Sequence, residues 1–331
     1  MALRLHALYK PTLPKMDNSV IEQMRSKTAL VTGGTDGVGK EVARGLAERG
    51  ARLVIVGRDA EKGARAERDI RASTKNSNVD FVQADLSLVR EACRLGDEVA
   101  GRWSAIHYLV HSAGIVRGRR VVTAEGFESN FATNYLSRFA LTVRLLSSLR
   151  AAGQPGNSAR IVVVAAPGSN GTIHYDDVNL TKNFSTIRAL KQYQHANDLF
   201  VVESARRLTV PGERPSVTIS CLHPGVVTKT NIRKEFPLWM KLMVRLVADP
   251  LFSNTPDVPA AAALRLLLAE EFEGESGALF SVLQKFKRLS LPLNVEDPRE
   301  GHRLWAFSEE VISDALGRQT VLASAAVRRA T

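Results

Sequence analysis

The stretch Thr28-Ala-Leu-Val-Thr-Gly-Gly-Thr-Asp-Gly-Val-Gly39 decides the fold of this chain. It begins with an apolar, β-rich run that predicts a buried strand, and a helical pattern follows as far as about Gly50. Glycines between a strand and a helix allow a tight turn and a close approach of the backbone to a ligand. The N-terminus of the helix then offers free N–H groups and a partial positive charge to a pyrophosphate. The sequence therefore predicts a dinucleotide on this turn, with contacts from Gly33, Thr35, Asp36, Gly37, Val38 and Gly39.

Short apolar runs recur along the chain, and helical patterns separate them. These runs predict further strands at 52–57, 79–83, 106–110, 160–165, 217–222 and 277–280. Helices are expected at about 59–73, 88–102, 123–151 and 186–208. This alternation implies right-handed crossovers and a parallel sheet with helices on both faces. The predicted fold class is α/β, a Rossmann-type doubly wound parallel sheet in a single domain.

The composition suits a soluble globular protein, with 44% hydrophobic and 24% charged residues. The formal net charge is +11, but Lys and Arg are scattered among Asp and Glu. This scatter favours a phosphate-binding site over a basic surface, so we expect no nucleic-acid partner. Cys93 and Cys221 are the only cysteines and lie far apart, which predicts a reducing compartment, no disulfide framework and no metal cluster.

The ends of the chain carry no clear targeting signal. No apolar stretch reaches the roughly 18 residues that a membrane span needs. The first residues lack the continuous apolar core of a signal peptide. We therefore expect a cytoplasmic protein without a membrane span, with an N-terminal arm over 1–26, the main domain over 27–318 and a C-terminal tail over 319–331.

The end of the second strand bears on the choice of cofactor. A site that prefers NAD(H) usually places an acidic residue here, against the ribose 2′-hydroxyl. This chain has Gly57-Arg58-Asp59 instead, and Arg58 could pair with a 2′-phosphate. NADP(H) is therefore favoured over NAD(H). The alternative is that Arg58 is an ordinary surface charge and that Asp59 caps the next helix.

The segment Thr32-Gly-Gly-Thr-Asp-Gly-Val-Gly-Lys-Glu41 resembles the opening of the short-chain dehydrogenase/reductase family, particularly of its retinol-dehydrogenase-like members. Other motifs of the family follow in order, and the resemblance covers about residues 27–312. It implies that Asp85 contacts the adenine, that His111-Ser-Ala-Gly114 borders the cofactor, and that His223-Pro-Gly-Val-Val227 cradles the nicotinamide amide. The contacts implied outside the glycine turn are Arg58, Asp85, Leu86, Ser112, Ala113, Gly114, Pro224, Gly225, Val227 and Thr228.

The catalytic residues of the family are largely absent from this chain. The resemblance implies a Ser that orients the carbonyl, a Tyr that exchanges the proton, a Lys that lowers the pKa of that Tyr, and an Asn that anchors a water. Alignment on Ala196-Asn-Asp-Leu-Phe200 places Ala166, Leu190 and Gln194 at the Ser, Tyr and Lys positions. The alternative alignment uses Tyr193 as the Tyr and puts Asn197 at the Lys position. Only Asn134 matches in both.

The proton donor is therefore open. Tyr193 lies three residues after Leu190, about 60° around the helix, and could serve as an unconventional donor. It could equally pack against a neighbouring element or at a subunit interface. Ser169 lies on the loop after the alanines, and further candidate donors are His174, Tyr175, Lys191 and His195. A carbonyl held against the nicotinamide could also take its proton from water or from its own hydroxyl group.

Residues 231–256 match the region that forms a lid over the substrate in this family. The lid contains apolar residues near helical spacing, namely Leu238, Trp239, Leu242, Met243, Leu246 and Val247. Lys241 and Arg245 fall on the other side. This pattern predicts a bulky lipophilic carbonyl substrate, although the helix could also touch a membrane surface or pack on its own domain.

Three functions fit these observations. The first is an NADPH-dependent ketone or enone reductase with an atypical proton relay, acting on substrates such as conjugated or aromatic products of secondary metabolism. The second is a catalytically inactive NADP-binding homologue with a regulatory or structural role. The third is a dehydratase, isomerase or cyclase that reuses the fold. The family resemblance also leads us to expect a homodimer as one candidate oligomeric state.

Overall fold

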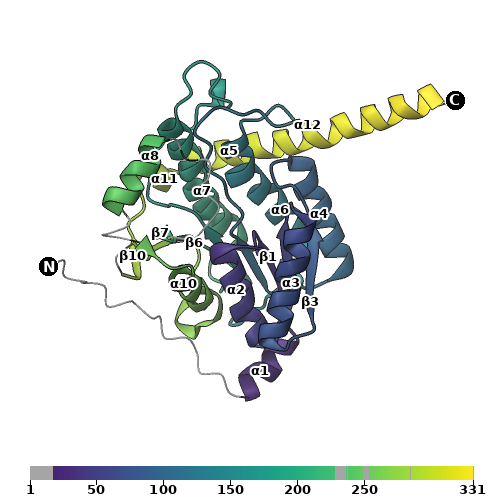
Figure 1. Ribbon diagram of the computed structural model, residues 1–331, viewed down its shortest axis with the longest axis vertical. Helices are drawn as coiled ribbons and strands as arrows, with labels where there is room; N and C mark the ends of the chain where they lie inside the picture. The colour runs from purple at the N-terminus through teal and green to yellow at the C-terminus, as the bar shows by residue number, and fades with distance from the viewer. Residues whose placement is uncertain (1–17, 228–235, 237, 249–252, 284, 331) are drawn as a thin grey trace.

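An eight-stranded sheet forms the centre of the molecule (Figure 1). The computed structural model describes residues 18–227, 236, 238–248, 253–283 and 285–330. The strands are β1 (Thr28–Thr32), β2 (Arg52–Gly57), β3 (Val79–Gln83), β4 (Tyr108–His111), β5 (Ala159–Val164), β6 (Val217–His223), β9 (Ala278–Ser281) and β10 (Lys287–Leu289). They lie in the order β10-β9-β6-β5-β4-β1-β2-β3, and all neighbours are parallel except the antiparallel pair β9 and β10.

Helices cover both faces of this sheet. One face carries α2 (Gly37–Glu48), α3 (Ala60–Thr74) and α10 (Asp257–Leu268), and the other carries α4 (Val89–Arg102), α6 (Ser137–Ala152), α7 (Thr186–Leu208) and the start of α12 (Pro298–Ala330). Successive strand residues alternate between the two layers. Leu30 of β1 lies in one core cluster and Val31 in the other, and both are fully buried. Burial on both faces explains why the strands read as continuous apolar runs, and the predicted fold class is confirmed.

The chain reverses its direction of winding between β1 and β4. It runs outward through β1, β2 and β3, and then crosses back to place β4 on the other side of β1. In doubly wound sheets a ligand binds outside the carboxyl ends of the strands at this switch point. The ends of β1 and β4, at Thr32 and His111, therefore mark the cofactor side of the sheet.

Two features differ from the sequence-based expectation. The helix predicted from Thr123 begins only at Ser129, because residues 123–127 form a turn and the Glu128 carboxylate caps the helix through the N–H groups of Asn130 and Phe131. It runs as α5 (Ser129–Phe131), a π-helical turn η1 (Ala132–Leu136) and α6. The edge strand β10 was not expected, since its Lys-Arg-Leu sequence carries no apolar alternation.

The remaining elements lie around this frame. They are α1 (Asn18–Arg25), η2 (Tyr175–Asp177), the two-stranded ribbon of β7 (Val226–Val227) and β8 (Ser253–Asn254), α8 (Leu238–Met243), η4 (Val244–Ala248), η5 (Glu270–Phe272) and α11 (Leu293–Glu296). The ranges expected for the arm, the lid and the tail stay predictions. Most of the arm, and the lid residues 231–235, 237 and 249–252, fall outside the described residues. Among the residues described, no helix combines the length and hydropathy needed to cross a bilayer.

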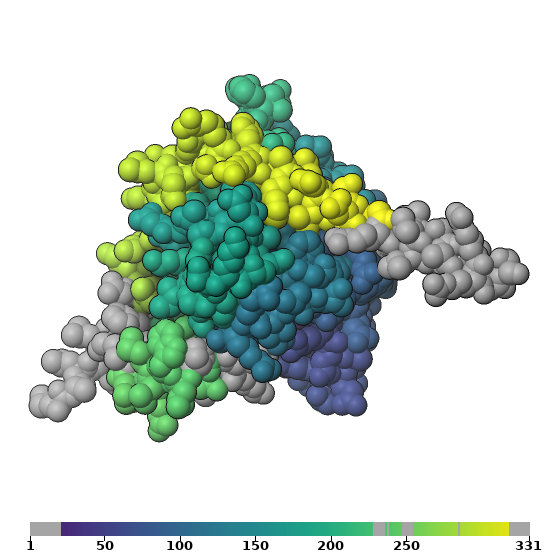
Figure 2. All heavy atoms as spheres, turned by 90° about the horizontal axis from the view of Figure 1, so that it is seen from above, coloured from purple at the N-terminus to yellow at the C-terminus, as the bar shows by residue number. Residues whose placement is uncertain are grey.

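The part of the predicted lid that the structure describes is an exposed apolar helix. Leu238 is 82% exposed, and Trp239, Leu242 and Met243 are at least half exposed. Figure 2 shows α8 as a distinct group of green atoms at the surface. The apolar side chains of α8 are therefore exposed, which differs from the interpretation of this segment as a helix packed on its own domain.

Candidate functional site

The glycine turn has the backbone geometry that a closely approached ligand requires. Gly33 and Gly37 have φ angles of +67° and +51°, which residues with a Cβ rarely adopt. A Cβ at Gly33 would lie 2.7 Å from the Ala113 nitrogen, and a Cβ at Gly39 would collide with the Gly33 carbonyl. Helix α2 begins at Gly37, and Val38 at its start is buried. The turn is thus packed against the end of β4 and presents the N-terminus of α2.

Asp36 fixes the start of α2. Its Oδ1 accepts a hydrogen bond from the Gly37 nitrogen at 2.9 Å, and its Oδ2 pairs with Lys62 Nζ of α3 at 2.7 Å. Thr35 lies beside the end of β2, where a Cβ added at Gly57 would stand 2.8 Å from Thr35 Cγ2. The structure therefore brings the glycine turn and the end of β2 into contact.

Arg58 stands at the end of β2 with its side chain exposed. Its carbonyl accepts from Gln83 Nε2 at 3.0 Å, but within the described chain its guanidinium has no hydrogen-bond or ion-pair partner. The neighbouring Asp59 is used structurally, because its Oδ1 caps α3 through the Lys62 nitrogen at 2.9 Å. Asp59 is thus engaged at the start of α3, and the charged group without a described partner at the end of β2 is the guanidinium of Arg58.

The end of β4 is tied to β1 through one hydroxyl group. Thr32 Oγ1 accepts hydrogen bonds from the nitrogens of Ser112 and Ala113, at 3.1 and 3.2 Å. Ser112, Ala113 and Gly114 are all half-buried beside the glycine turn. A Cβ at Gly114 would lie 2.9 Å from Asn134 Oδ1, so this segment also touches the helix that carries Asn134.

Asp85 and Leu86 lie just beyond β3, at the same edge of the sheet. Asp85 Oδ1 accepts from the Ser87 nitrogen at 3.0 Å and the side chain is half-buried, whereas Leu86 is buried. The carboxyl ends of β1, β2, β3 and β4 therefore gather the predicted cofactor residues along one edge. That these residues contact a cofactor stays a prediction.

Asn134 lies in the π-helical turn η1, a deformation that often marks functional sites. Its side chain is fully engaged with one backbone unit: Oδ1 accepts from the Ile115 nitrogen at 2.9 Å and Nδ2 donates to the Ile115 carbonyl at 2.8 Å. Its own carbonyl accepts from Asn197 Nδ2 at 3.0 Å. Asn134 thus joins the segment after β4 to α7.

Helix α7 runs without interruption from Thr186 to Leu208. Leu190 and Gln194 are one turn apart and both are half-buried, as are Ala165 and Ala166 after β5. The unbroken helix fits both alignments, because Tyr193 and Asn197 are also one turn apart on α7. The assignment of the four catalytic positions stays a prediction.

Tyr193 of α7 packs into the hydrophobic core, and its side chain is only 8% exposed. Burial raises the pKa of its hydroxyl, while the positive charge of Arg138 acts to lower it. Arg138 is also buried, and its guanidinium donates to Asn197 Oδ1 at 3.1 Å and to the Ala113 carbonyl at 2.9 Å. The sequence analysis missed Arg138. The available signal was a single cation among the apolar residues that follow Asn134.

The contacts and exposure of four other candidate proton donors can be compared with those of Tyr193. His174 Nε2 accepts from Arg188 at 3.0 Å, and Lys191 is exposed. The ring of Tyr175 lies 4.0 Å from the Arg303 guanidinium, in a cation–π contact. Burial lowers the pKa of His195 to about 4, so this residue is neutral at physiological pH.

The Pro-Gly loop follows β6. Gly225 has a φ of +75° and donates its N–H to His223 Nδ1 at 2.9 Å. A Cβ at Gly225 would lie 2.6 Å from Asn254 Nδ2. Pro224 and Val227 are half-buried, whereas Thr228 lies outside the described residues. The conformation of the loop thus requires glycine at the position where the family motif has it.

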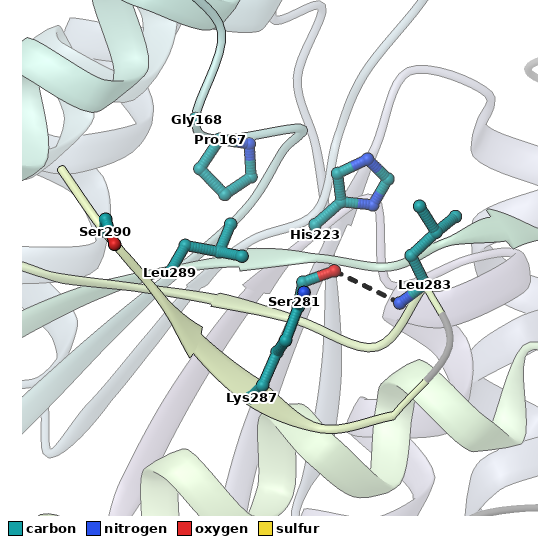
Figure 3. A pocket seen from close by; sticks show the side chains of 8 residues that line it. All are labelled: Pro167, Gly168, His223, Ser281, Leu283, Lys287, Leu289 and Ser290. Atoms are coloured by element: carbon teal, nitrogen blue, oxygen red, sulfur yellow. Dashed lines mark hydrogen bonds between the residues drawn. The ribbon is translucent and has the colours of Figure 1, made fainter. Parts of the chain in front are cut away.

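A cavity of about 320 Å³ opens beside this loop (Figure 3). Its lining consists of Pro167, Gly168, His223, Ser281, Leu283, Lys287, Leu289 and Ser290. Pro167 and Gly168 directly follow Ala166, so the cavity adjoins the position predicted to be the family's Ser. Lys287 and Leu289 were missed from the sequence because β10 was not expected, and Ser281 was missed because it lies one residue beyond the strand predicted at 277–280. No cluster of residues suited to a metal ion occurs in the described part of the chain.

A buried carboxyl group lies behind the cavity. Asp198 of α7 is fully buried, and its Oδ2 accepts from the Gly168 nitrogen at 2.9 Å. Its Oδ1 has no hydrogen-bond partner among the described residues. Burial raises the pKa of Asp198 to about 8. The carboxyl group is therefore mostly protonated at neutral pH and holds the loop after β5 through the Gly168 N–H.

Comparison with known proteins agrees with this geometry. The family model for short chain dehydrogenases matches residues 27–175. Retinol dehydrogenase 12 of Mus musculus is 34% identical over 291 residues, which cover 88% of this chain and 87% of the relative. Polyprenol dehydrogenase of Homo sapiens is 30% identical over 286 residues, which cover 86% and 84%.

Solved structures share the fold. A crystal structure of an uncharacterized protein from Mycobacterium paratuberculosis superimposes with a TM-score of 0.67 at 27% identity, covering 87% of this chain and 94% of that chain. The NADP complex of RhlG from Pseudomonas aeruginosa has a TM-score of 0.60 at 24% identity, covering 78% and 94%, and supports the fold alone. The sheet order, the glycine turn at the switch point and these relatives lead to one conclusion: this chain is a member of the short-chain dehydrogenase/reductase family of oxidoreductases.

Proposed function

We propose that this protein is an NADPH-dependent reductase that acts on a ketone or enone of a bulky lipophilic molecule. One observation carries the proposal: the glycine turn at the start of α2 lies against the end of β2, where the guanidinium of Arg58 is exposed and has no partner among the described residues. The names of the relatives, retinol dehydrogenase and polyprenol dehydrogenase, describe lipophilic substrates of those proteins. Their example favours a lipophilic substrate here as well.

The preference for NADPH rests on the end of β2. The 2′-phosphate of NADPH adds negative charge next to the ribose, and a guanidinium is the side chain best suited to bind it. The guanidinium of Arg58 has no partner among the residues that the structure describes, whereas Asp59 caps α3. An acidic residue that would repel the phosphate is thus engaged elsewhere. The glycine turn has positive φ angles at Gly33 and Gly37, and Cβ atoms at Gly33 or Gly39 would meet the backbone. Such a turn at the N-terminus of α2 suits a pyrophosphate.

The proton step would use different residues from those of the family. Reduction of a carbonyl adds a hydride to carbon and a proton to oxygen, and bound NADPH supplies the hydride. Tyr193 is our candidate proton donor. Burial raises the pKa of the Tyr193 hydroxyl, and the charge of Arg138 opposes this rise, which is the electrostatic role that we assign to Arg138 in place of the missing lysine. Asn134 and Asn197 position these groups, because Asn197 bonds to Arg138 and to the Asn134 carbonyl.

The burial of Tyr193 favours a second candidate function. A donor that is 8% exposed reaches few substrate oxygens. The same cofactor edge would then serve a protein that binds NADPH without turning it over and transmits the presence of cofactor to a partner. Both functions require NADPH to bind, and they differ only in turnover.

Isothermal titration of the purified protein with NADPH and NADH is the decisive experiment. We expect NADPH to bind more tightly, and Arg58→Asp to weaken NADPH at least tenfold while NADH changes little. Arg52→Asp is the matched control, because it makes the same charge change at the opposite end of β2. Equal loss of both cofactors in Arg58→Asp would refute the 2′-phosphate assignment.

Turnover separates the two candidates. Lipophilic ketones and enones should be screened for consumption of NADPH in step with product formation. Selective NADPH binding without any turnover would favour the second function. Conversion of a substrate without consumption of NADPH would refute the reductase and indicate a non-redox reaction.

A further inference from the structure

Three neighbouring strands place polar side chains in one row at the carboxyl edge of the sheet. His223 of β6 lies in register with Ser281 of β9, and Ser281 lies in register with Lys287 of β10. Residues directly opposite each other in a sheet project to the same face. We call His223, Ser281 and Lys287 the donor row, and Figure 3 shows all three in the wall of the cavity.

Each member of the donor row has a hydrogen to donate. His223 Nδ1 accepts from the Gly225 nitrogen, so in the neutral ring the proton is on Nε2. Ser281 Oγ accepts from the Leu283 nitrogen at 3.1 Å, which leaves its O–H available as a donor. The ammonium group of Lys287 has three donors and no acceptor. The row therefore presents hydrogen-bond donors to a single ligand group.

The donor row also carries the positive charge of Lys287, and the described lining of the cavity provides no negative charge to balance it. In the part of the chain that the structure describes, Lys287 has no ion-pair partner, whereas its neighbour Arg288 pairs with Glu275 at 2.8 Å. The described lining of the cavity contains no acidic residue, and its other members include the apolar Pro167, Leu283 and Leu289. A cavity with apolar walls and a cationic, donor-rich end suits an amphipathic anion.

The position of the cavity connects it to the reaction. Strand β5 pairs with β6, and the Ala165 nitrogen donates to the Leu222 carbonyl, so Ala166 and the start of the donor row are near neighbours. A volume of about 320 Å³ accommodates part of a ligand rather than a whole lipophilic molecule. The cavity is thus suited to one end of a substrate whose reacting carbonyl lies closer to the nicotinamide.

We propose that the donor row binds the carboxylate of the substrate, so that the protein reduces a lipophilic oxo acid. A single unpaired cation with two neutral donors matches a group of one negative charge. A phosphate group would call for a second cation or for the paired donors of an arginine. The proposal rests on the proposed function for the identity of the ligand as substrate, but the binding itself does not depend on turnover.

Binding of decanoate and of decan-1-ol to the full-length protein tests this proposal, because the two probes share an alkyl chain and differ in charge. We expect decanoate to bind at least tenfold more tightly in titration calorimetry, and expect high salt to reduce the difference. Lys287→Met should remove the preference. Lys285→Met is the matched control, since Lys285 is exposed, lies two residues earlier and is not part of the lining.

Two results would overturn the proposal. One is equal affinity of the wild-type protein for both probes, and the other is an equal effect of Lys285→Met and Lys287→Met. Ser281→Ala provides a second variant with a milder change, and we expect it to weaken decanoate several-fold while decan-1-ol is unaffected. Loss of the carboxylate preference with intact NADPH selectivity would refute this inference alone, whereas the reverse result would refute only the proposed function.

Discussion

Replacing Asp198 with asparagine should change how the stability of the protein depends on pH. The carboxyl group is fully buried behind the cavity, where one oxygen accepts from Gly168 and the other has no described partner. Asparagine has the same shape and can keep the bond from the Gly168 N–H, but it cannot ionise. The substitution therefore removes one titration and little else.

The size of the effect follows from the pKa of Asp198, which burial raises from the ordinary value of 3.8 to about 8. The folded state holds the proton more tightly than the unfolded chain does, so its stabilisation is fully present below about pH 4. It is lost as the pH rises toward about 8. At about 1.4 kcal/mol per pH unit, the loss between about pH 5 and pH 8.5 is at most ~4 kcal/mol. Relaxation around the ionised group reduces this to about 2–4 kcal/mol.

Urea unfolding of both proteins over this pH range measures the difference directly. We expect the wild-type protein to lose stability relative to Asp198→Asn as the pH rises, with Asp198→Asn the more stable protein at about pH 8.5. The comparison cancels the contributions of the buried histidines, because both proteins contain them. Parallel stability curves for the two proteins would show that Asp198 ionises normally and would refute the reasoning.

Three further substitutions test other parts of the structure. Gly33→Ala forces a Cβ to within 2.7 Å of the Ala113 nitrogen at a positive φ; we expect it to lower stability by about 1–3 kcal/mol and to weaken NADPH, whereas Gly101→Ala, where nothing lies within 4 Å, should do neither. Tyr193→Phe should reduce kcat by about 100-fold or more with unchanged NADPH affinity, and unchanged turnover would exclude Tyr193 as the donor. Arg160→Met removes the cation that pairs with Glu273 at 2.6 Å, and we expect it to lower the free energy of unfolding in urea by about 3–5 kcal/mol. A decrease below about 1 kcal/mol would contradict a buried ion pair.

The sequence was sufficient to predict most of the sheet. Strands β2 and β3 have the predicted bounds. Strand β2 is a continuous apolar run between Arg52 and Gly57, whereas in β3 the polar Asp80 lies between the apolar Val79 and Phe81. The start of α5 was misplaced, since the turn at 123–127 resembles the first turn of a helix until its hydrogen bonds are known. Strand β10 was missed because three residues, two of them charged, give no periodic signal.

The site was only partly predictable, for a different reason. Arg58 and the glycine turn depend on local sequence, and their positions follow from the strand-turn-helix order. The burial of Tyr193 and the contact of Arg138 with Asn197 depend on how α6 and α7 pack, which no local pattern encodes. The donor row depends on the register of β10 with β9 and of β9 with β6, and β6 is distant in sequence from the other two strands. That the predicted residues bind cofactor stays a prediction, as do the cytoplasmic location and the homodimer.

The antiparallel strand β10 ends one side of the sheet, and this has a consequence for how the protein behaves in concentrated solution. An unpaired strand edge invites another chain to add to it, and long apolar edges promote aggregation. Strand β10 is three residues long, and Lys287 and Arg288 are both exposed on it. Such a short, cationic edge opposes strand addition by a second copy. Lys287, which we propose as a ligand contact, therefore also opposes self-association, and its replacement by an uncharged residue should lower the concentration at which the protein self-associates.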